Sequence, residues 1–203
     1  MWRADARNKF WQVPTNYSEF EADGTYHAVW NATCWQDINL SLWSLVPWAT
    51  ALGNFTIPWT ALSIKTFDGA GVLAVSAYWS TEILHDYKQW SDITPHIHWC
   101  PTTTWAGNVK WQLEYAWINR LWTITSSTTI SVTAATSWVV AQELRSSFPA
   151  ITGTWMDIGS RFVFRLFRDP TDVADTYWAE AGAFDFWIHY EIDTLWSRQI
   201  TIK

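Results

Sequence analysis

Glycine is scarce in this chain: only 8 of the 203 residues are glycine, whereas 19 are tryptophan. A β-rich protein normally uses glycine at turns where the backbone needs a positive φ angle. Several tryptophans stand in such turn-like contexts, for example Trp90 within residues 88–92 and Trp155 within residues 152–157. The shortage of glycine and the excess of tryptophan therefore need a common explanation.

Two interpretations of the tryptophans are open. In the first, they form an aromatic surface that stacks against a ligand, as in a carbohydrate-binding module. In the second, the gene contains UGA codons that the host decodes as glycine, and the tryptophans in the sequence come from a codon table that assigns UGA to tryptophan. The sequence favours the second, and the suspected positions are Trp2, Trp11, Trp30, Trp43, Trp48, Trp59, Trp79, Trp90, Trp105, Trp122, Trp138, Trp155, Trp178, Trp187 and Trp196. The tryptophans in strand-like or aromatic-rich contexts, expected to be genuine, are Trp35, Trp99, Trp111 and Trp117.

Positive charge is also in short supply, with 13 Lys and Arg against 19 Asp and Glu, a net charge of −6 and a pI of about 5.2. A protein that binds nucleic acid normally carries a basic face, so we expect no nucleic-acid partner. The apolar runs are only as long as strands, and the start of the chain has no signal-peptide pattern. We therefore expect that the protein is synthesised in the cytoplasm and does not contact a membrane. The two cysteines, Cys34 and Cys100, lack the spacing of a metal or redox motif, and we expect free thiols.

Recognisable catalytic motifs are absent as well. The chain contains no G-x-S-x-G, no phosphate-binding glycine-rich loop, no H-E-x-x-H and no C-x-x-C. We therefore predict a protein that is not an enzyme and that has no cofactor.

Alternating apolar and polar residues are the main structural signal. The alternation is clearest over residues 108–119, 161–168 and 184–193, and a two-residue period indicates half-buried strands. Further strands are expected at 71–78, 93–99, 122–135 and 198–203, with a strand or short helix at 139–148. The predicted fold is an all-β, antiparallel, jelly-roll-like β-sandwich over residues 31–203, preceded by an irregular N-terminal arm over residues 1–30. The aromatics expected in its core strands are Trp99, Trp111, Tyr115, Trp117, Phe162, Phe164, Phe186 and Tyr190.

Histidines provide one candidate site. On a strand, His96, His98 and Cys100 share a face, and two imidazoles two residues apart can bind one metal ion, with His189 or Glu191 as a third ligand. The competing interpretation is that these histidines form hydrogen bonds across strands. No second ligand pair has a recognisable spacing, so the sequence favours the hydrogen-bonded face and predicts no metal.

Carboxylates provide two further candidates. Asp169, Asp172 and Asp175 could bind calcium, but the spacing is not that of an EF-hand, and a turn in which Asp caps backbone N–H groups is favoured. Glu191 and Asp193, with Asp185 nearby, could act as a glycosidase pair. Alternating charges on an exposed strand produce the same pattern, and that interpretation is preferred.

Residues 85–99 read HDYKQWSDITPHIHW and resemble a group of tailed-bacteriophage proteins that carry the pattern HxYKxGSDIxPHxHW. The resemblance continues through residues 107–115, 166–169, 175–177 and 184–198, and covers roughly residues 30–203. At two places the pattern has glycine where this chain has Trp90 and Trp196, which supports the recoding interpretation separately from the turn contexts. The resemblance implies a structural role in the phage particle and carries over no catalytic or ligand-binding residue.

The predicted function is therefore a structural component of a tailed-phage particle (head decoration, neck or tail) that acts by assembly. Its expected partners are other virion proteins and further copies of itself, in a trimer, and its expected location is the virion. The alternative is a carbohydrate- or receptor-binding β-sandwich that contacts a surface glycan through exposed aromatics. A third, weaker interpretation is a glycan hydrolase. The residues expected at the assembly or ligand surface are Trp90, Trp105, Trp155 and Trp196.

Overall fold

The computed structural model describes residues 20–22, 25–27, 34–42, 52–69, 75–124 and 126–192. By its internal contacts the chain divides into two compact units, Met1–Trp35 and Gln36–Lys203. In the first unit, β1 (Phe20–Ala22) and β2 (Thr25–His27) form an antiparallel hairpin. Most of the arm expected over residues 1–30 lies outside the described residues, and its described part is this hairpin rather than irregular chain.

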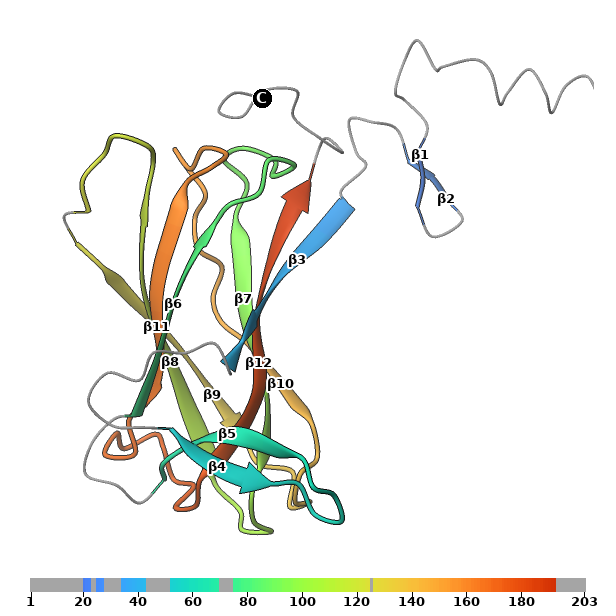
Figure 1. The fold of residues 1–203 in the computed structure, drawn as a ribbon, viewed down its shortest axis with the longest axis vertical. Helices are drawn as coiled ribbons and strands as arrows, with labels where there is room; N and C mark the ends of the chain where they lie inside the picture. Colours follow the sequence, from blue (N-terminus) through green and yellow to red (C-terminus); the bar gives the residue numbers. More distant parts are fainter. Residues whose placement is uncertain are drawn as a thin grey trace, which may run out of the picture. The chain divides into compact units, whose positions relative to one another are not determined.

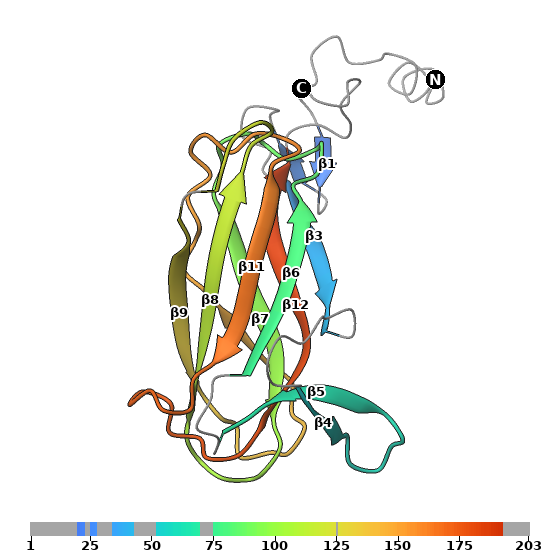
Figure 2. The ribbon, with the colours of Figure 1, turned by 60° about the vertical axis from the view of Figure 1, so that its left-hand side comes forward.

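The second unit is a sandwich of two sheets, drawn in Figure 1. The six-stranded sheet has the order β10-β7-β12-β5-β4, with β3 paired to β12. Its strands are β3 (Cys34–Ser41), β4 (Gly53–Thr56), β5 (Ser63–Phe67), β7 (Ile93–Pro101), β10 (Leu144–Ser147) and β12 (Ala181–Ile192). The four-stranded sheet has the order β6-β11-β8-β9, seen side by side in Figure 2. Its strands are β6 (Val75–Glu82), β8 (Asn108–Ile118), β9 (Thr128–Ala135) and β11 (Arg161–Arg168).

The strand pairings within the sandwich other than that of β3 with β12 are antiparallel. The predicted all-β, jelly-roll-like antiparallel sandwich is therefore confirmed. Within the described part of the chain, no helix is long and apolar enough to cross a membrane. Cys34 and Cys100 are both free thiols.

Alternation along the strands builds the core. In β8, Val109, Trp111 and Leu113 are buried, and Tyr115 and Trp117 pack against the core from its margin. In β11, Phe162, Phe164 and Leu166 are buried in the same way. In β12, the buried residues after the β-bulge at Ala183/Asp185 are Phe186, Ile188 and Tyr190.

Aromatic contacts between the two sheets fill the centre of the sandwich. Trp111 of β8 meets Trp99 of β7 with ring centroids 5.8 Å apart and Phe67 of β5 with centroids 5.1 Å apart, both nearly edge to face. Each such pair contributes about 0.5–1.5 kcal/mol beyond the burial of its area. The indole of Trp99 also donates to Ser146 Oγ at 2.8 Å, so its polar edge is satisfied inside the core.

Trp79 belongs to this core and not to the turns. It lies in β6, is 8% exposed, and stacks on Phe186 with centroids 5.8 Å apart. Its Nε1–H donates to the carbonyl of Ser41 at 3.1 Å. The assignment of Trp79 to the suspected glycines is therefore wrong in structural terms, because a glycine here would leave a large void between the sheets.

Several strand boundaries differ from the sequence prediction. The strand expected at 71–78 extends further toward the C-terminus, as β6, and residues 70–74 lie outside the described part. The strand expected from residue 122 begins only at Thr128 as β9, and β10 occupies just Leu144–Ser147 of the region 139–148. Residues 198–203 lie outside the described residues. The deviations arise where Thr- and Ser-rich or short apolar segments form turns, whose hydrogen bonds do not appear in a hydrophobic pattern.

Candidate functional site

Polar side chains concentrate on the outward face of the six-stranded sheet. Ile97 and Trp99 of β7 point into the core, so the residues that alternate with them face away from it. We call the set of polar residues on this face the outer-face cluster. Its members are His96 and His98 of β7, Asp185, Trp187 and His189 of β12, Asp37 and Asn39 of β3, and Glu143 and Arg145 at the start of β10.

Strand register brings the outer-face cluster together from distant parts of the sequence. Across the β7–β12 ladder, Trp187 stands opposite His96 and Asp185 opposite His98. On the other side of β7, Arg145 of β10 stands opposite His98. Directly opposed residues on one face of an antiparallel pair are close enough for their side chains to interact.

Two histidines and a carboxylate form a hydrogen-bonded chain in the outer-face cluster. His98 Nδ1 lies 2.5 Å from Glu143 Oε1, and its Nε2 lies 3.0 Å from His96 Nε2. When the Glu143 carboxylate accepts the Nδ1–H of His98, the Nε2 of His98 accepts the Nε2–H of His96. This assignment leaves the Nδ1 of His96 as an acceptor.

A second contact between a histidine and a carboxylate adjoins this chain. His189 Nδ1 contacts Asp37 Oδ1, and the ring of His189 stacks on that of His96 with centroids 4.3 Å apart and planes 15° apart. Next to it, Asn39 Nδ2 donates to Asp185 Oδ2 at 3.2 Å. The strand β3 therefore supplies a carboxylate and an amide that the sequence did not place near the histidines.

Three buried polar atoms of the outer-face cluster have no hydrogen-bond partner among the described residues: His96 Nδ1, Asp185 Oδ1 and Trp187 Nε1. Leaving a buried donor or acceptor unpaired costs about 1–3 kcal/mol. Native proteins therefore satisfy almost all such groups, and an exception needs a structural or functional reason. A group of three exceptions on one sheet face marks this face as a candidate binding surface.

Burial also controls the protonation of His96. Its side chain is 2% exposed, and desolvation lowers its pKa from 6.5 to about 4, with further lowering by the nearby His189, His98 and Arg145. His96 is thus neutral at neutral pH, which agrees with its role as a donor to His98 through one nitrogen only.

We expect acid to destabilise the fold through His96. Because the pKa of His96 is about 4 in the folded state and 6.5 when unperturbed, the unfolded chain binds one more proton between these values. The free energy of unfolding should therefore fall by about 2–3 kcal/mol as the pH drops through that window. Urea titrations across the window should show this slope in the parent protein and a much smaller one in His96→Gln. An equal slope in the two proteins would rule out His96 as its source.

The histidines predicted as low-priority metal ligands do come together, but as hydrogen-bonding partners. His98 and His189 each use Nδ1 to contact a carboxylate, and His96 uses Nε2 to contact His98. Over the described ranges, no group of three or more His, Cys, Asp and Glu residues is arranged to hold a metal ion. Cys100, expected on the same face as His96 and His98, is buried, and burial raises the pKa of its thiol to about 12.

Three of the tryptophans proposed for an assembly or ligand surface, Trp90, Trp105 and Trp155, lie in loops. Trp90 and Trp155 come together at one end of the sandwich, with ring centroids 6.2 Å apart. Trp105 follows β7 whereas Trp90 precedes it, so these two lie at opposite ends of that strand. Trp196 lies outside the described residues. No single surface therefore unites the described members of this set.

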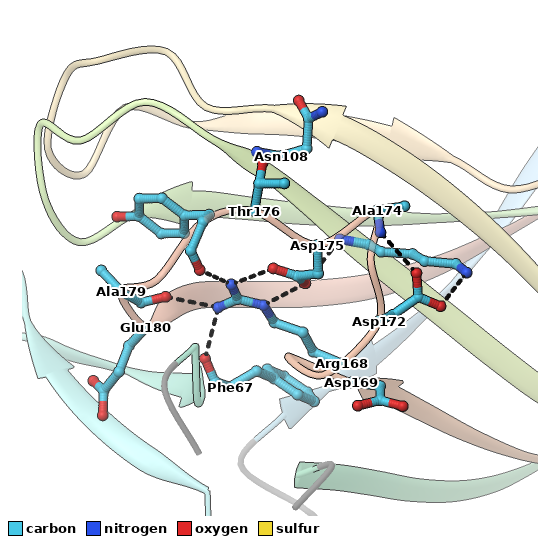
Figure 3. Close-up of polar contacts among 12 residues, drawn as sticks. Phe67, Asn108, Arg168, Asp169, Asp172, Ala174, Asp175, Thr176, Ala179 and Glu180 are labelled. Atoms are coloured by element: carbon cyan, nitrogen blue, oxygen red, sulfur yellow. Dashed lines mark hydrogen bonds and ion pairs between the residues drawn. The ribbon is translucent and has the colours of Figure 1, made fainter. Parts of the chain in front are cut away.

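A buried ion pair anchors the loop between β11 and β12 (Figure 3). Arg168, at the end of β11, is fully buried and donates from Nε and Nη2 to the two carboxylate oxygens of Asp175, each at 2.8 Å. Its remaining donors reach the backbone carbonyls of Ala179 (2.7 Å), Phe67 (3.4 Å) and Tyr177. A bidentate pair with every donor satisfied is the arrangement in which a buried charge is stable.

Each described carboxylate that the sequence raised as a calcium or glycosidase candidate has at least one side-chain or backbone partner. Asp172 pairs with Lys110 at 2.5 Å, and this hydrogen bond lowers the pKa of the Asp172 carboxyl. Asp169 accepts from Thr171, which is the turn capping that the sequence favoured. Glu191 pairs with Lys88 at 2.6 Å, and Asp193 lies outside the described residues.

Five residues with a role in these networks were not predicted from the sequence: Arg168, Asp37, Asn39, Glu143 and Arg145. The only available signal for Arg168 was a charged residue at the end of an apolar strand, followed by an aspartate in the next loop. The others come from strands or strand ends whose pairing is not encoded locally.

Comparison with known proteins gives distant structural likenesses only. No protein-family model matches the chain, and no curated protein matches it. Among solved structures, the CBM36-1 domain of a multidomain xylanase from the hindgut metagenome of Trinervitermes trinervoides is 6% identical, with a TM-score of 0.42 over 76% of this chain and 96% of that one. A family 35 carbohydrate binding module from Clostridium thermocellum is 6% identical, with a TM-score of 0.44 over 75% and 97%. TmCBM61 in complex with beta-1,4-galactotriose is 10% identical, with a TM-score of 0.37 over 76% and 86%. At these identities and TM-scores the likenesses contribute nothing to the argument about function.

Proposed function

We propose that this protein is a non-catalytic β-sandwich module that binds a carbohydrate on the outer-face cluster. The observation that carries the proposal is the combination, on one sheet face, of the half-buried Trp187 ring with the partly exposed polar side chains of His98 and His189. A sugar presents hydroxyl groups that both donate and accept, and a C–H face that packs on an aromatic ring. The chemistry of such a ligand matches the mixture of side chains found there.

The carboxylates of this face favour binding over hydrolysis. Asp37 contacts His189, Glu143 contacts His98, and Asp185 accepts from Asn39, so each is held by a neighbouring side chain. A general acid for glycoside cleavage needs a raised pKa and a partner carboxylate at a defined separation. The hydrogen bond from Lys110 lowers the pKa of the Asp172 carboxyl, which is the opposite of what a general acid needs.

Carbohydrate binding is tested with a glycan array, followed by calorimetry on the tightest ligand. We expect Trp187→Ala to weaken binding about tenfold, because the loss of one aromatic stacking contact costs about 1.4 kcal/mol. Trp178→Ala is the matched control, since Trp178 is an exposed indole in the β11–β12 loop, away from the cluster, and its removal should leave the affinity unchanged. Equal losses in the two variants, or no binding to any glycan, would refute the proposal.

A second candidate function is a structural component of a tailed-phage particle, and it is supported by the resemblance at residues 85–99, 107–115, 166–169, 175–177 and 184–198. In this fold the matching residues have architectural roles: Trp99 fills the core, and Arg168 and Asp175 form the buried ion pair. A motif built from such residues fits a protein that works through assembly. The same protein preparation separates the candidates: a defined oligomer in sedimentation without glycan binding favours assembly, and a strict monomer that binds glycan favours the first function.

A further inference from the structure

Positive φ angles single out a subset of the tryptophans. Six non-glycine residues in the described part of the chain have positive φ, and four of them are tryptophan: Trp59 (65°), Trp90 (69°), Trp138 (66°) and Trp155 (71°). L-residues with a side chain rarely adopt this left-handed region, whereas glycine enters it freely. Tryptophan, a bulky residue, is a genuine outlier there.

Turn geometry makes the same point for three of the four. Thr60 N–H donates to the Ile57 carbonyl at 3.2 Å, which closes the turn Ile57-Pro58-Trp59-Thr60. Proline in the second position and positive φ in the third define a type II turn, whose third residue is normally glycine. Trp90 occupies the same third position in the turn closed by Ser91 N–H and the Lys88 carbonyl at 3.1 Å.

Trp155 is the third residue of the turn closed by Met156 N–H and the Gly153 carbonyl at 2.8 Å. This turn is already crowded, because a Cβ on Gly153 would lie 1.7 Å from the carbonyl oxygen of Ser91. At Gly153 the turn lies too close to the backbone of Ser91 for a side chain, and at Trp155 it needs a left-handed backbone conformation. Both requirements are ones that glycine meets.

The four side chains contribute nothing to the core. Trp59 is fully exposed, and Trp90, Trp138 and Trp155 are 60–67% exposed. By contrast, Trp79, Trp99 and Trp111 are buried in strands, and none of these three has positive φ. These seven tryptophans thus divide by backbone conformation into core residues and residues at glycine positions.

We infer that positions 59, 90, 138 and 155 are glycine in the native protein, encoded by UGA and read by a glycyl-tRNA whose anticodon pairs with UGA. The glycine codon GGA differs from UGA in its first base alone, so a single anticodon change gives a glycine tRNA this reading. Tryptophan at the core positions is encoded by UGG. Trp187, which the sequence also raised as a suspected glycine, lies in β12 without positive φ, so the inference does not extend to it or to the outer-face cluster. The inference removes Trp90 and Trp155 from any binding surface.

The test is the coding DNA together with the peptide masses of the protein isolated from its natural source. We expect UGA at codons 59, 90, 138 and 155, UGG at codons 79, 99 and 111, and peptide masses that correspond to glycine at the first set. UGG at the four turn codons would overturn the inference. So would UGA codons whose peptides carry the mass of tryptophan, because the host would then insert the indole despite the strained geometry.

Discussion

Replacement of Arg168 by methionine is expected to lower the free energy of unfolding by about 3–5 kcal/mol, the usual cost of breaking a buried ion pair. The side chain of Asp175 is 1% exposed, so its charge would remain inside the protein without a counterion. The carbonyls of Phe67, Tyr177 and Ala179 would lose their donor at the same time. Methionine has a similar length, so the loss reports the charge and hydrogen bonds rather than a large cavity.

The measurement is urea unfolding followed by far-ultraviolet circular dichroism. Arg161→Met is the matched control, because Arg161 is exposed and lies 3.4 Å from the exposed Glu82. A surface pair of this kind contributes about 0–1 kcal/mol. If the two variants lose the same stability, the network of Arg168 does not have the role described here.

The joint replacement of Trp59, Trp90, Trp138 and Trp155 by glycine is expected to stabilise the protein by about 2–4 kcal/mol. A side chain in the left-handed region destabilises the folded state by about 1–2 kcal/mol per residue, and glycine removes this strain. Glycine also raises the entropy of the unfolded chain, which offsets about 0.5–1 kcal/mol of the stabilisation at each site. The sites are distant from one another except for the contact of Trp90 with Trp155, so the contributions should be nearly additive.

The matched control is the triple replacement of Trp105, Trp122 and Trp178 by glycine. These indoles are exposed to a similar degree, but their backbone does not have positive φ. The control should lose about 0.5–1 kcal/mol per site, because glycine adds flexibility to the unfolded chain without relieving strain. If the fourfold variant were destabilised as much as the control, positive φ would not distinguish the two groups. Thermal unfolding by calorimetry measures both.

Features of this fold that depend on residues close together in the sequence could be predicted, and features that depend on residues far apart in the sequence could not. The alternation of β8 and β11 is local, and the strand at 161–168 has the predicted limits. His96 and His98 share a face because a strand repeats every two residues, so their proximity could be expected. The partners of the histidines could not be predicted, because Asp37 and Glu143 are brought near them by the pairing of β3 and β10 with strands distant in the sequence.

The buried Arg168 could not be predicted for a different reason. Charged residues at strand ends are usually solvated, and nothing in a hydrophobic pattern distinguishes the exception. Its burial depends on a loop that folds back to present Asp175 and two carbonyls from the sequence that follows β11. The turn tryptophans are the opposite case: the sequence raised the recoding, and the φ angles of Trp59, Trp90, Trp138 and Trp155 now separate these positions from Trp79.

One consequence of the Arg168 network concerns the cooperativity of unfolding. Its guanidinium projects from the four-stranded sheet, yet it is bonded to Phe67 at the end of β5 in the six-stranded sheet and to the loop that leads into β12. Separating the sheets would remove the Phe67 carbonyl from this buried charge. We therefore expect the two layers to unfold in one transition, with no accumulation of a state in which one sheet is intact and the other is melted.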